Sequence, residues 1–195
     1  EAINKWGKCR TGAITMYGAG VGVYGNSGYA YTGSTPSKLK KRIEEANSSN
    51  AEITDINITE NGNYVIILGG SGYWTLGYPD AFLKKLEQYR TGDLRDDNIL
   101  SACFNDRGEW VVITDKHYSY SNETIKNFIL KAEELYEEVY YAYITNYGMI
   151  ACCKNGVYYK NIPSNLAEAL KKLTFKPKVI KFTDNGLYLI TDGES

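Results

Sequence analysis

Four markers at nearly constant spacing constrain the fold of this chain more than any other sequence feature. A Pro or Asn opens an amphipathic run at Pro36, Pro79, Asn122 and Pro163, and these markers are separated by 43, 43 and 41 residues. Large apolar residues stand three and seven positions after each marker, on one face of a helix. These residues are Leu39, Ile43, Phe82, Leu86, Ile125, Ile129, Leu166 and Leu170. The spacing predicts four helices, each opened by a residue suited to a first turn.

Each predicted helix is preceded by segments with the period of β-strands. The second unit alternates apolar and polar residues over 53–59, turns at Asn61-Gly62 and returns through an apolar run over 64–68. Asn-Gly between two such runs is a strong hairpin signal, because a tight turn of the favoured hand needs a positive φ. A short aromatic strand over 72–75 then leads to the helix. The sequence therefore predicts a repeated unit of hairpin, third strand and helix.

Units of this size cannot bury their apolar faces alone, so neighbouring copies must cover one another. We predict a single α+β domain over 1–195, built from tandem ββ(β)α repeats, four complete and one C-terminal half. The approximate units are 10–50, 51–97, 98–137, 138–177 and 178–195, the last completed by 1–9. The favoured architecture is a closed, five-bladed, propeller-like ring with helices outside, in which Trp6-Gly7 acts as the missing third strand. The alternative is an open array of antiparallel hairpins with the helices on one face.

Charge and hydropathy argue against two kinds of partner. The chain has 22 basic and 23 acidic residues, a formal net charge of −1, whereas a nucleic-acid surface needs a basic face or stripe. The basic cluster over 38–42 falls in a predicted helix, and we interpret it as a solvated helix face. No apolar run approaches the roughly 20 residues that a membrane span needs. We expect neither nucleic-acid binding nor a membrane span, and the sequence leaves the oligomeric state open.

Composition gives a hint about location. Tyr occurs 18 times and His once, and a surface rich in Tyr and Asn is typical of extracytoplasmic binding proteins. We therefore expect a secreted or extracytoplasmic protein, with a cytoplasmic location left open. The chain begins at Glu1 rather than Met, as expected if a signal peptide has been removed or the chain belongs to a longer protein. Four cysteines are too few for a disulfide scaffold at this length, and their redox state is left open.

The sharpest catalytic hypothesis is a Cys–His nucleophilic hydrolase or transferase. Such a site needs a thiolate held near an imidazole, and the candidates are His117 with Cys152 or Cys153. The simpler interpretation favours structure. His117 occupies the turn position that other units fill with Gly, where a positive φ would tolerate His. Cys152 and Cys153 lie in an apolar run that reads as a buried strand.

Motifs for metals and cofactors are missing from the sequence. There is no Cys-x-x-Cys pair and no His-x-x-x-His pair. The glycine stretches over 18–22 and 69–72 match neither a dinucleotide-binding fingerprint nor a phosphate-binding loop, and they read as hairpin turns. We expect no metal and no cofactor.

The third strands carry the residues that favour a binding function. Aromatic residues recur there in successive units, and large rings with a polar handle form good contact surfaces for sugars or peptides. The candidate ligand-binding residues are Tyr31, Trp74, Tyr118, Tyr120, Tyr158 and Tyr159. The leading hypothesis is a non-catalytic repeat module that binds a glycan or a protein through this aromatic rim. Packing of the same rings beneath the helices is the competing interpretation, and a structural spacer within a larger protein is a further alternative.

Overall fold

The computed structural model describes residues 8–194 as four helices and five small antiparallel sheets, so the chain is an α+β protein of repeated units. The elements in chain order are β1 (Thr11–Ile14), β2 (Gly20–Tyr24), β3 (Gly28–Tyr31), α2 (Ser37–Ser48), β4 (Ile53–Ile58), β5 (Tyr64–Leu68), β6 (Gly72–Leu76), α3 (Asp80–Arg90), β7 (Ile99–Phe104), β8 (Trp110–Thr114), β9 (Tyr118–Tyr120), α4 (Glu123–Tyr136), β10 (Val139–Ile144), β11 (Met149–Cys153), β12 (Gly156–Lys160), α5 (Ser164–Lys171), β13 (Val179–Phe182) and β14 (Tyr188–Thr191).

All four helices begin directly after the predicted markers. Pro36, Pro79 and Pro163 cap α2, α3 and α5, where the missing N–H of proline costs no hydrogen bond. Asn122 caps α4 through its side chain, whose Oδ1 accepts a hydrogen bond of 2.9 Å from the backbone N–H of Ile125. The apolar residue three positions after each marker is fully buried in every case. The helix prediction is confirmed.

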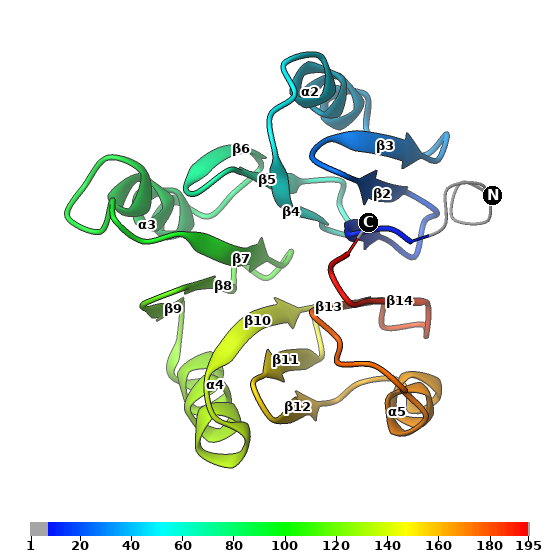
Figure 1. Ribbon diagram of the computed structural model, residues 1–195, viewed down its shortest axis with the longest axis vertical. Coiled ribbons are helices and arrows are strands. Elements are labelled where there is room, and N and C mark those ends of the chain that lie inside the picture. Colours follow the sequence, from blue (N-terminus) through cyan, green and yellow to red (C-terminus); the bar gives the residue numbers. More distant parts are fainter. Residues whose placement is uncertain (1–7, 195) are drawn as a thin grey trace.

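The five sheets are arranged around a common centre with the helices at the periphery (Figure 1). Contacts join β1 to β4, β4 to β7, β7 to β10 and β10 to β13, and β1 also contacts β13 and β14. The first and last sheets are therefore neighbours. Within residues 8–194 no strand pairing joins one sheet to another, so they do not form one closed sheet or barrel.

The two ends of the described chain meet beside β14. The Thr191 hydroxyl donates a 3.0 Å hydrogen bond to the backbone oxygen of Arg10, and Lys8 Nζ lies 2.8 Å from Asp192 Oδ2. The predicted completion of the last unit by the N-terminal segment rests mainly on residues 1–7, including Trp6-Gly7, which lie outside the described residues. No strand within 8–194 pairs with the outer edge of β14.

Each of the four helices buries its apolar face against two neighbouring sheets. Leu39 and Ile43 of α2, for example, share one cluster with Val23 of the first sheet and with Ile56 and Ile66 of the second. Full burial of an aliphatic side chain of this kind stabilises a fold by about 1.5–3 kcal/mol. Because this burial crosses from unit to unit, the copies stabilise one another, as the repeat pattern predicts. Within the described part, no helix is both long and apolar enough to cross a membrane.

Candidate functional site

Polar side chains from the inner strands meet at the centre of the molecule. We call five of them, Asp55, Asn57, Tyr141, Tyr143 and Lys181, the axial cluster. They come from β4, β10 and β13, and none is more than 7% exposed; Asp55 and Lys181 are both fully buried. Burying an unpaired charge is very costly, so these groups require partners.

The hydrogen-bonding groups around the buried ion pair are satisfied by the protein itself. Lys181 Nζ lies 2.8 Å from Asp55 Oδ1 and 3.0 Å from the backbone oxygen of Ile56, and it also donates to Asn57 Oδ1. These three acceptors match the three protons of an ammonium group. Asp55 accepts further hydrogen bonds, from the Tyr141 hydroxyl at 2.8 Å and from the backbone N–H of Ala102 at 3.1 Å. The Lys181–Asp55 pair therefore stabilises the fold, and neither of its charged groups is free for a ligand.

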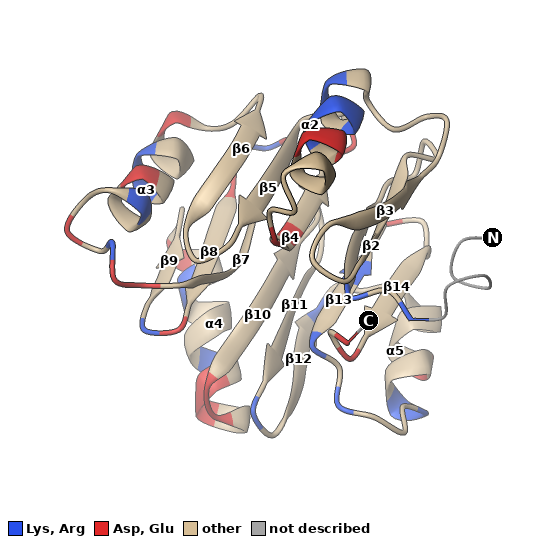
Figure 2. Ribbon diagram, turned by 45° about the horizontal axis from the view of Figure 1, so that its top comes forward, with Lys and Arg blue, Asp and Glu red and all other residues tan. Residues whose placement is uncertain are grey.

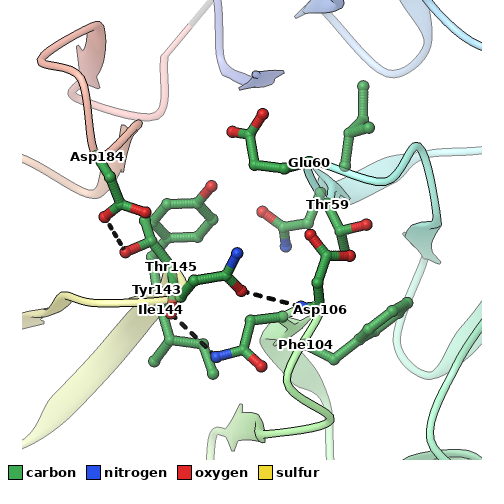
Figure 3. A pocket seen from close by; sticks show the side chains of 12 residues that line it. Thr59, Glu60, Phe104, Asp106, Tyr143, Ile144, Thr145 and Asp184 are labelled. Atoms are coloured by element: carbon green, nitrogen blue, oxygen red, sulfur yellow. Dashed lines mark hydrogen bonds between the residues drawn. The ribbon is translucent and has the colours of Figure 1, made fainter. Parts of the chain in front are cut away.

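A small pit lies at the end of the inner strands where the first turn of each hairpin begins (Figure 3). Glu60, Asp106 and Asp184 come from the second, third and fifth units and surround it, together with Thr145 and Tyr143. The cavity volume is about 20 Å³, which is room for about one water molecule. We call it the axial pit, and its volume is too small for a substrate.

The three carboxylates of the axial pit connect turns of neighbouring units. Glu60 accepts from the backbone N–H of Met16 at 2.9 Å, and Asp184 Oδ1 accepts from the Thr145 hydroxyl at 2.6 Å. Asp106 Oδ2 accepts from the backbone N–H of residue 61 at 3.2 Å. Burial, followed by the charges of Asp106 and Asp184, raises the pKa of the Glu60 carboxyl. Among residues 8–194 no group of three or more His, Cys, Asp or Glu is placed to hold a metal ion.

The residues of the Cys–His hypothesis do not meet. His117 Nδ1 lies 2.6 Å from Asp97 Oδ2, and no hydrogen bond within the described chain joins His117 to a thiol. Cys152 and Cys153 are at most 1% exposed. Burial raises the pKa of the Cys153 thiol to about 11 and that of Cys152 further still, whereas an activated nucleophile needs a lowered pKa.

The explanation of the His117 position by a positive φ is wrong. His117 is not among the residues with positive φ, and neither are its counterparts Gly72 and Gly156. Glycine is required there by close approach instead: a Cβ on Gly72 would lie 2.8 Å from the backbone oxygen of Leu68, and one on Gly156 would lie 2.5 Å from the ring of Tyr136. The His117 backbone is instead held by its N–H, which donates to the Thr114 hydroxyl at 2.7 Å.

The predicted aromatic residues lie on the outer strands of four separate sheets (Figure 1). Helices cover several of them. The hydroxyls of Tyr31 and Tyr118 donate to Glu44 and Glu133 on helices of their own units, at 2.8 and 2.9 Å. Other members of the set pack in the core or against a neighbouring unit. Tyr158 stacks on Phe128 of the preceding helix, Tyr120 packs at the edge of the core, and Tyr159 is 38% exposed. Tyr31 and Trp74 pack against the cluster that contains α2, whereas Tyr118, Tyr120 and Tyr158 pack against the cluster that contains α4.

Trp74 of this set lies in a groove beside a helix. The groove runs between α2 and β6, has a volume of about 460 Å³, and is within the range of small-ligand sites. Its aromatic walls are Tyr64, Tyr73, Trp74 and Tyr78. The corresponding place between α4 and β12 is closed, because Phe128 of α4 stacks there on Tyr158 of β12 with ring centres 4.9 Å apart. We call the open junction the α2/β6 groove.

Basic side chains of α2 line the opposite wall of the α2/β6 groove. The blue segments of α2 in Figure 2 mark the basic residues of that helix. Arg42 stacks over the Trp74 ring at 5.0 Å and pairs with Glu45 at 2.7 Å. Lys38 and Lys41 are exposed and form no salt bridge within residues 8–194. The groove therefore joins an aromatic wall to two unpaired cations. The sequence predicts Trp74 as a binding residue but these cations as a solvated helix face, because the packing of α2 against the next sheet depends on the assembled fold.

Comparison with protein-family models, with curated proteins and with solved structures finds no match to this chain. The geometry of its own residues therefore carries the functional argument.

Proposed function

We propose that the five sheets form a closed, five-bladed, propeller-like ring that acts as a non-catalytic binding module. Three observations support the ring. The inner strands contact one another in chain order, β1 contacts β13 and β14, and the Lys181–Asp55 ion pair connects the fifth unit to the second across the centre. A ring of this kind presents its junctions to solvent as a rigid surface, on which binding groups are held in place.

The binding site of this module is the α2/β6 groove, and its partner is an acidic segment of another protein. One observation carries the proposal. In a groove of about 460 Å³, Lys38 and Lys41, which form no salt bridge within residues 8–194, lie across from the aromatic wall around Trp74. Ammonium groups at a rim attract carboxylates and speed association, while buried aromatic surface supplies contact area.

The stacking of Arg42 on the Trp74 ring favours a protein partner over a glycan. Sugar recognition by tryptophan uses an open ring face, but Arg42 already lies 5.0 Å from the centre of this ring. An acidic side chain can bind the exposed edge of the same guanidinium without displacing it. The groove thus suits a segment that combines carboxylates with apolar or aromatic side chains.

The test measures binding of a fluorescent peptide rich in Asp, Glu and Leu to the full chain at low ionic strength. We expect the double variant Lys38→Ala/Lys41→Ala to weaken binding about tenfold, which corresponds to about 1.4 kcal/mol. The matched control is Lys84→Ala/Lys85→Ala, which removes the same charge from α3, since neither of these lysines lines the groove. We expect the control to bind within about twofold of the native chain.

Two results would contradict the proposal. Equal losses in both double variants would mean that the peptide responds to net charge rather than to the groove. Binding of a sulfated glycan that is lost in Lys38→Ala/Lys41→Ala, with no binding of the acidic peptide, would replace the protein partner by a carbohydrate.

A further inference from the structure

The axial pit is acidic and contains no cation of its own. Glu60, Asp106 and Asp184 line it, and none of the described residues around it is Lys, Arg or His. These three carboxylates form no salt bridge within residues 8–194. All three residues are half-buried, so water screens their charges less than it screens fully exposed ones. A small hollow lined by charges of one sign attracts the opposite charge, and the pit therefore favours a cation.

Tyr143 points to a ligand independently of the acidic residues. Its side chain is only 7% exposed, and its hydroxyl makes no hydrogen bond within residues 8–194. Figure 3 shows this hydroxyl pointing toward the space between Asp184 and Glu60. Asp106 Oδ1 is also buried, without a hydrogen-bond donor among the described residues. Buried polar groups are nearly always paired, so the pit is short of a group that donates hydrogen bonds.

The axial cluster shows how this fold binds an ammonium group. The Lys181 ammonium donates to three oxygen atoms, one of which belongs to the Asp55 carboxylate. It also lies 5.3 Å from the centre of the Tyr143 ring. Tyr143 thus turns its ring to this buried cation and its hydroxyl to the pit. The pit offers a second cation the same kinds of group, carboxylate oxygens and a neutral oxygen, at the end of the same strands.

The size of the pit separates an ammonium group from other cations. A volume of about 20 Å³ holds one water-sized group, which suits a compact ammonium and excludes a planar guanidinium. A calcium or magnesium ion needs oxygen ligands at about 2.0–2.6 Å, and no three acidic residues of the described chain are placed to hold a metal ion. Hydrogen bonds from an ammonium are longer, about 2.7–3.2 Å, and fit acceptors that lie farther apart.

We propose that the axial pit binds the ammonium group of a lysine side chain from another protein. The ammonium donates to the carboxylates of the pit and to the Tyr143 hydroxyl, while the stem of the lysine stays at the mouth. Burial raises the pKa of the Tyr143 hydroxyl, so this group stays protonated and can donate in turn to a carboxylate. The site is separate from the α2/β6 groove, since the two share no lining residue.

A second hollow beside the pit favours a lysine within a protein chain over a free amine. It has a volume of about 210 Å³ and shares Asn105 and Thr145 with the pit, and we call it the side hollow. Its lining includes Tyr147, which is 72% exposed, and Lys160, which forms no salt bridge within residues 8–194. A chain that carries the lysine can continue into the side hollow, pack on Tyr147 and place an acidic residue beside Lys160.

The test measures binding of N-acetyl-lysine methylamide to the full chain, followed by the amide signals of the pit residues in two-dimensional NMR spectra. A single side chain makes few contacts, so we expect a dissociation constant of about 1 mM. The same compound acetylated on its side-chain amine has lost the charge and should not bind at this concentration. N-acetyl-arginine methylamide, whose guanidinium exceeds the pit, should bind at least about fivefold more weakly. Equal binding of the lysine and arginine compounds would show a response to positive charge alone.

Two variants separate binding from folding. Tyr143→Phe removes a hydroxyl that has no partner in the described chain, so stability should be unchanged while the lysine compound binds about fivefold more weakly. Asp106→Asn removes one charge of the pit and should weaken binding about tenfold. The matched control is Asp93→Asn, which removes an equal charge at an exposed position after α3 and should bind within about twofold of the native chain. Unchanged binding in Tyr143→Phe and Asp106→Asn would contradict the proposal.

An acidic neighbour of the lysine tests the source of the ligand. The capped dipeptide Lys-Asp should bind about fivefold more tightly than the capped lysine, because its carboxylate reaches Lys160. Lys160→Ala should remove this gain and leave binding of the capped lysine unchanged. Equal binding of the two compounds by the native chain would make a free amine the ligand and overturn the assignment to a protein.

Two other results would overturn the proposal. Absence of any spectral change at about ten times the expected dissociation constant would mean that the pit holds water only. The third possibility is an inorganic cation. Without lysine binding, a gain in thermal stability from potassium chloride that tetramethylammonium chloride of the same ionic strength does not give would make that cation the ligand.

Discussion

The axial cluster and the α2/β6 groove contain the same chemical grouping in opposite surroundings. Lys181 pairs with Asp55 at 2.8 Å and lies 5.2 Å from the Tyr141 ring, and both charged side chains are fully buried. Arg42 pairs with Glu45 at 2.7 Å and lies 5.0 Å from the Trp74 ring, but the charged side chains are 44% and 39% exposed. Each grouping therefore consists of a cation, a carboxylate and an aromatic ring.

Exposure to water separates the roles of the two groupings. In the axial cluster every hydrogen bond must be made by protein, so loss of one partner leaves an uncompensated charge. In the groove, water can replace any partner, and the pair itself contributes little to stability. A buried grouping of this kind fixes the arrangement of the units, and an exposed one is free to exchange its partners for those of a ligand.

The largest expected effect is that of Lys181→Met, which leaves Asp55 as a buried carboxylate without its cation. We expect a loss of about 3–5 kcal/mol in the free energy of unfolding, the usual cost of breaking a buried ion pair. Urea denaturation followed by far-UV circular dichroism measures it. Lys126→Met, at a surface ion pair on α4, is the control and should change stability by less than about 1 kcal/mol.

The double variant Lys181→Met/Asp55→Asn sharpens this result. Removing both charges takes away the uncompensated carboxylate, so we expect the double variant to be more stable than Lys181→Met alone. Two losses that simply add would show that Lys181 and Asp55 do not depend on each other, which would contradict the assignment of one coupled grouping.

A smaller loss is expected from Tyr141→Phe. Its hydroxyl donates to Asp55 at 2.8 Å inside the axial cluster, and a hydrogen bond to a charged group contributes about 1.5–3 kcal/mol. Tyr143→Phe is the matched control, since the Tyr143 hydroxyl makes no hydrogen bond within residues 8–194. The same denaturation experiment compares them, and equal stabilities of the two variants would contradict the network.

The local elements of both regions could be predicted from the sequence, and their partners could not. Pro36 and Asn122 mark helix starts because capping depends on neighbouring residues alone, and hairpin turns follow from the same kind of local signal. The ion pair of Lys181 with Asp55 joins residues 126 positions apart, and only the assembled units bring them together. A usable signal did exist: when the units are aligned, Lys181 and Asp55 are charged residues at inward positions of predicted strands.

The sequence predicts only one residue of the proposed groove as a binding residue, for the same reason, and its binding role stays a prediction. Trp74 stood out as a large ring on an outer strand, but the contribution of α2 to the groove depends on how one unit packs on the next. The aromatic residues recur at equivalent places in successive units, and this recurrence predicts a single rim. Outer strands, however, lie far from the centre, so equivalent positions in successive units end at separate junctions (Figure 1).

The smallest expected effect is that of Arg42→Met on stability. The exposed pair with Glu45 and the stacking on Trp74 are partly offset by the thioether chain, which can cover the same ring, so we expect a change within about 0.5 kcal/mol. The same variant should weaken binding of the acidic peptide severalfold, because the guanidinium is lost from the groove.

Raising the ionic strength from low salt to about 0.5 M should likewise weaken the peptide complex. The contribution of Lys181 to the free energy of unfolding should stay nearly unchanged, since buried pairs are screened much less than exposed ones. A large loss of stability in Arg42→Met, or an axial pair that weakens with salt as much as the groove does, would mean that exposure does not divide the two groupings.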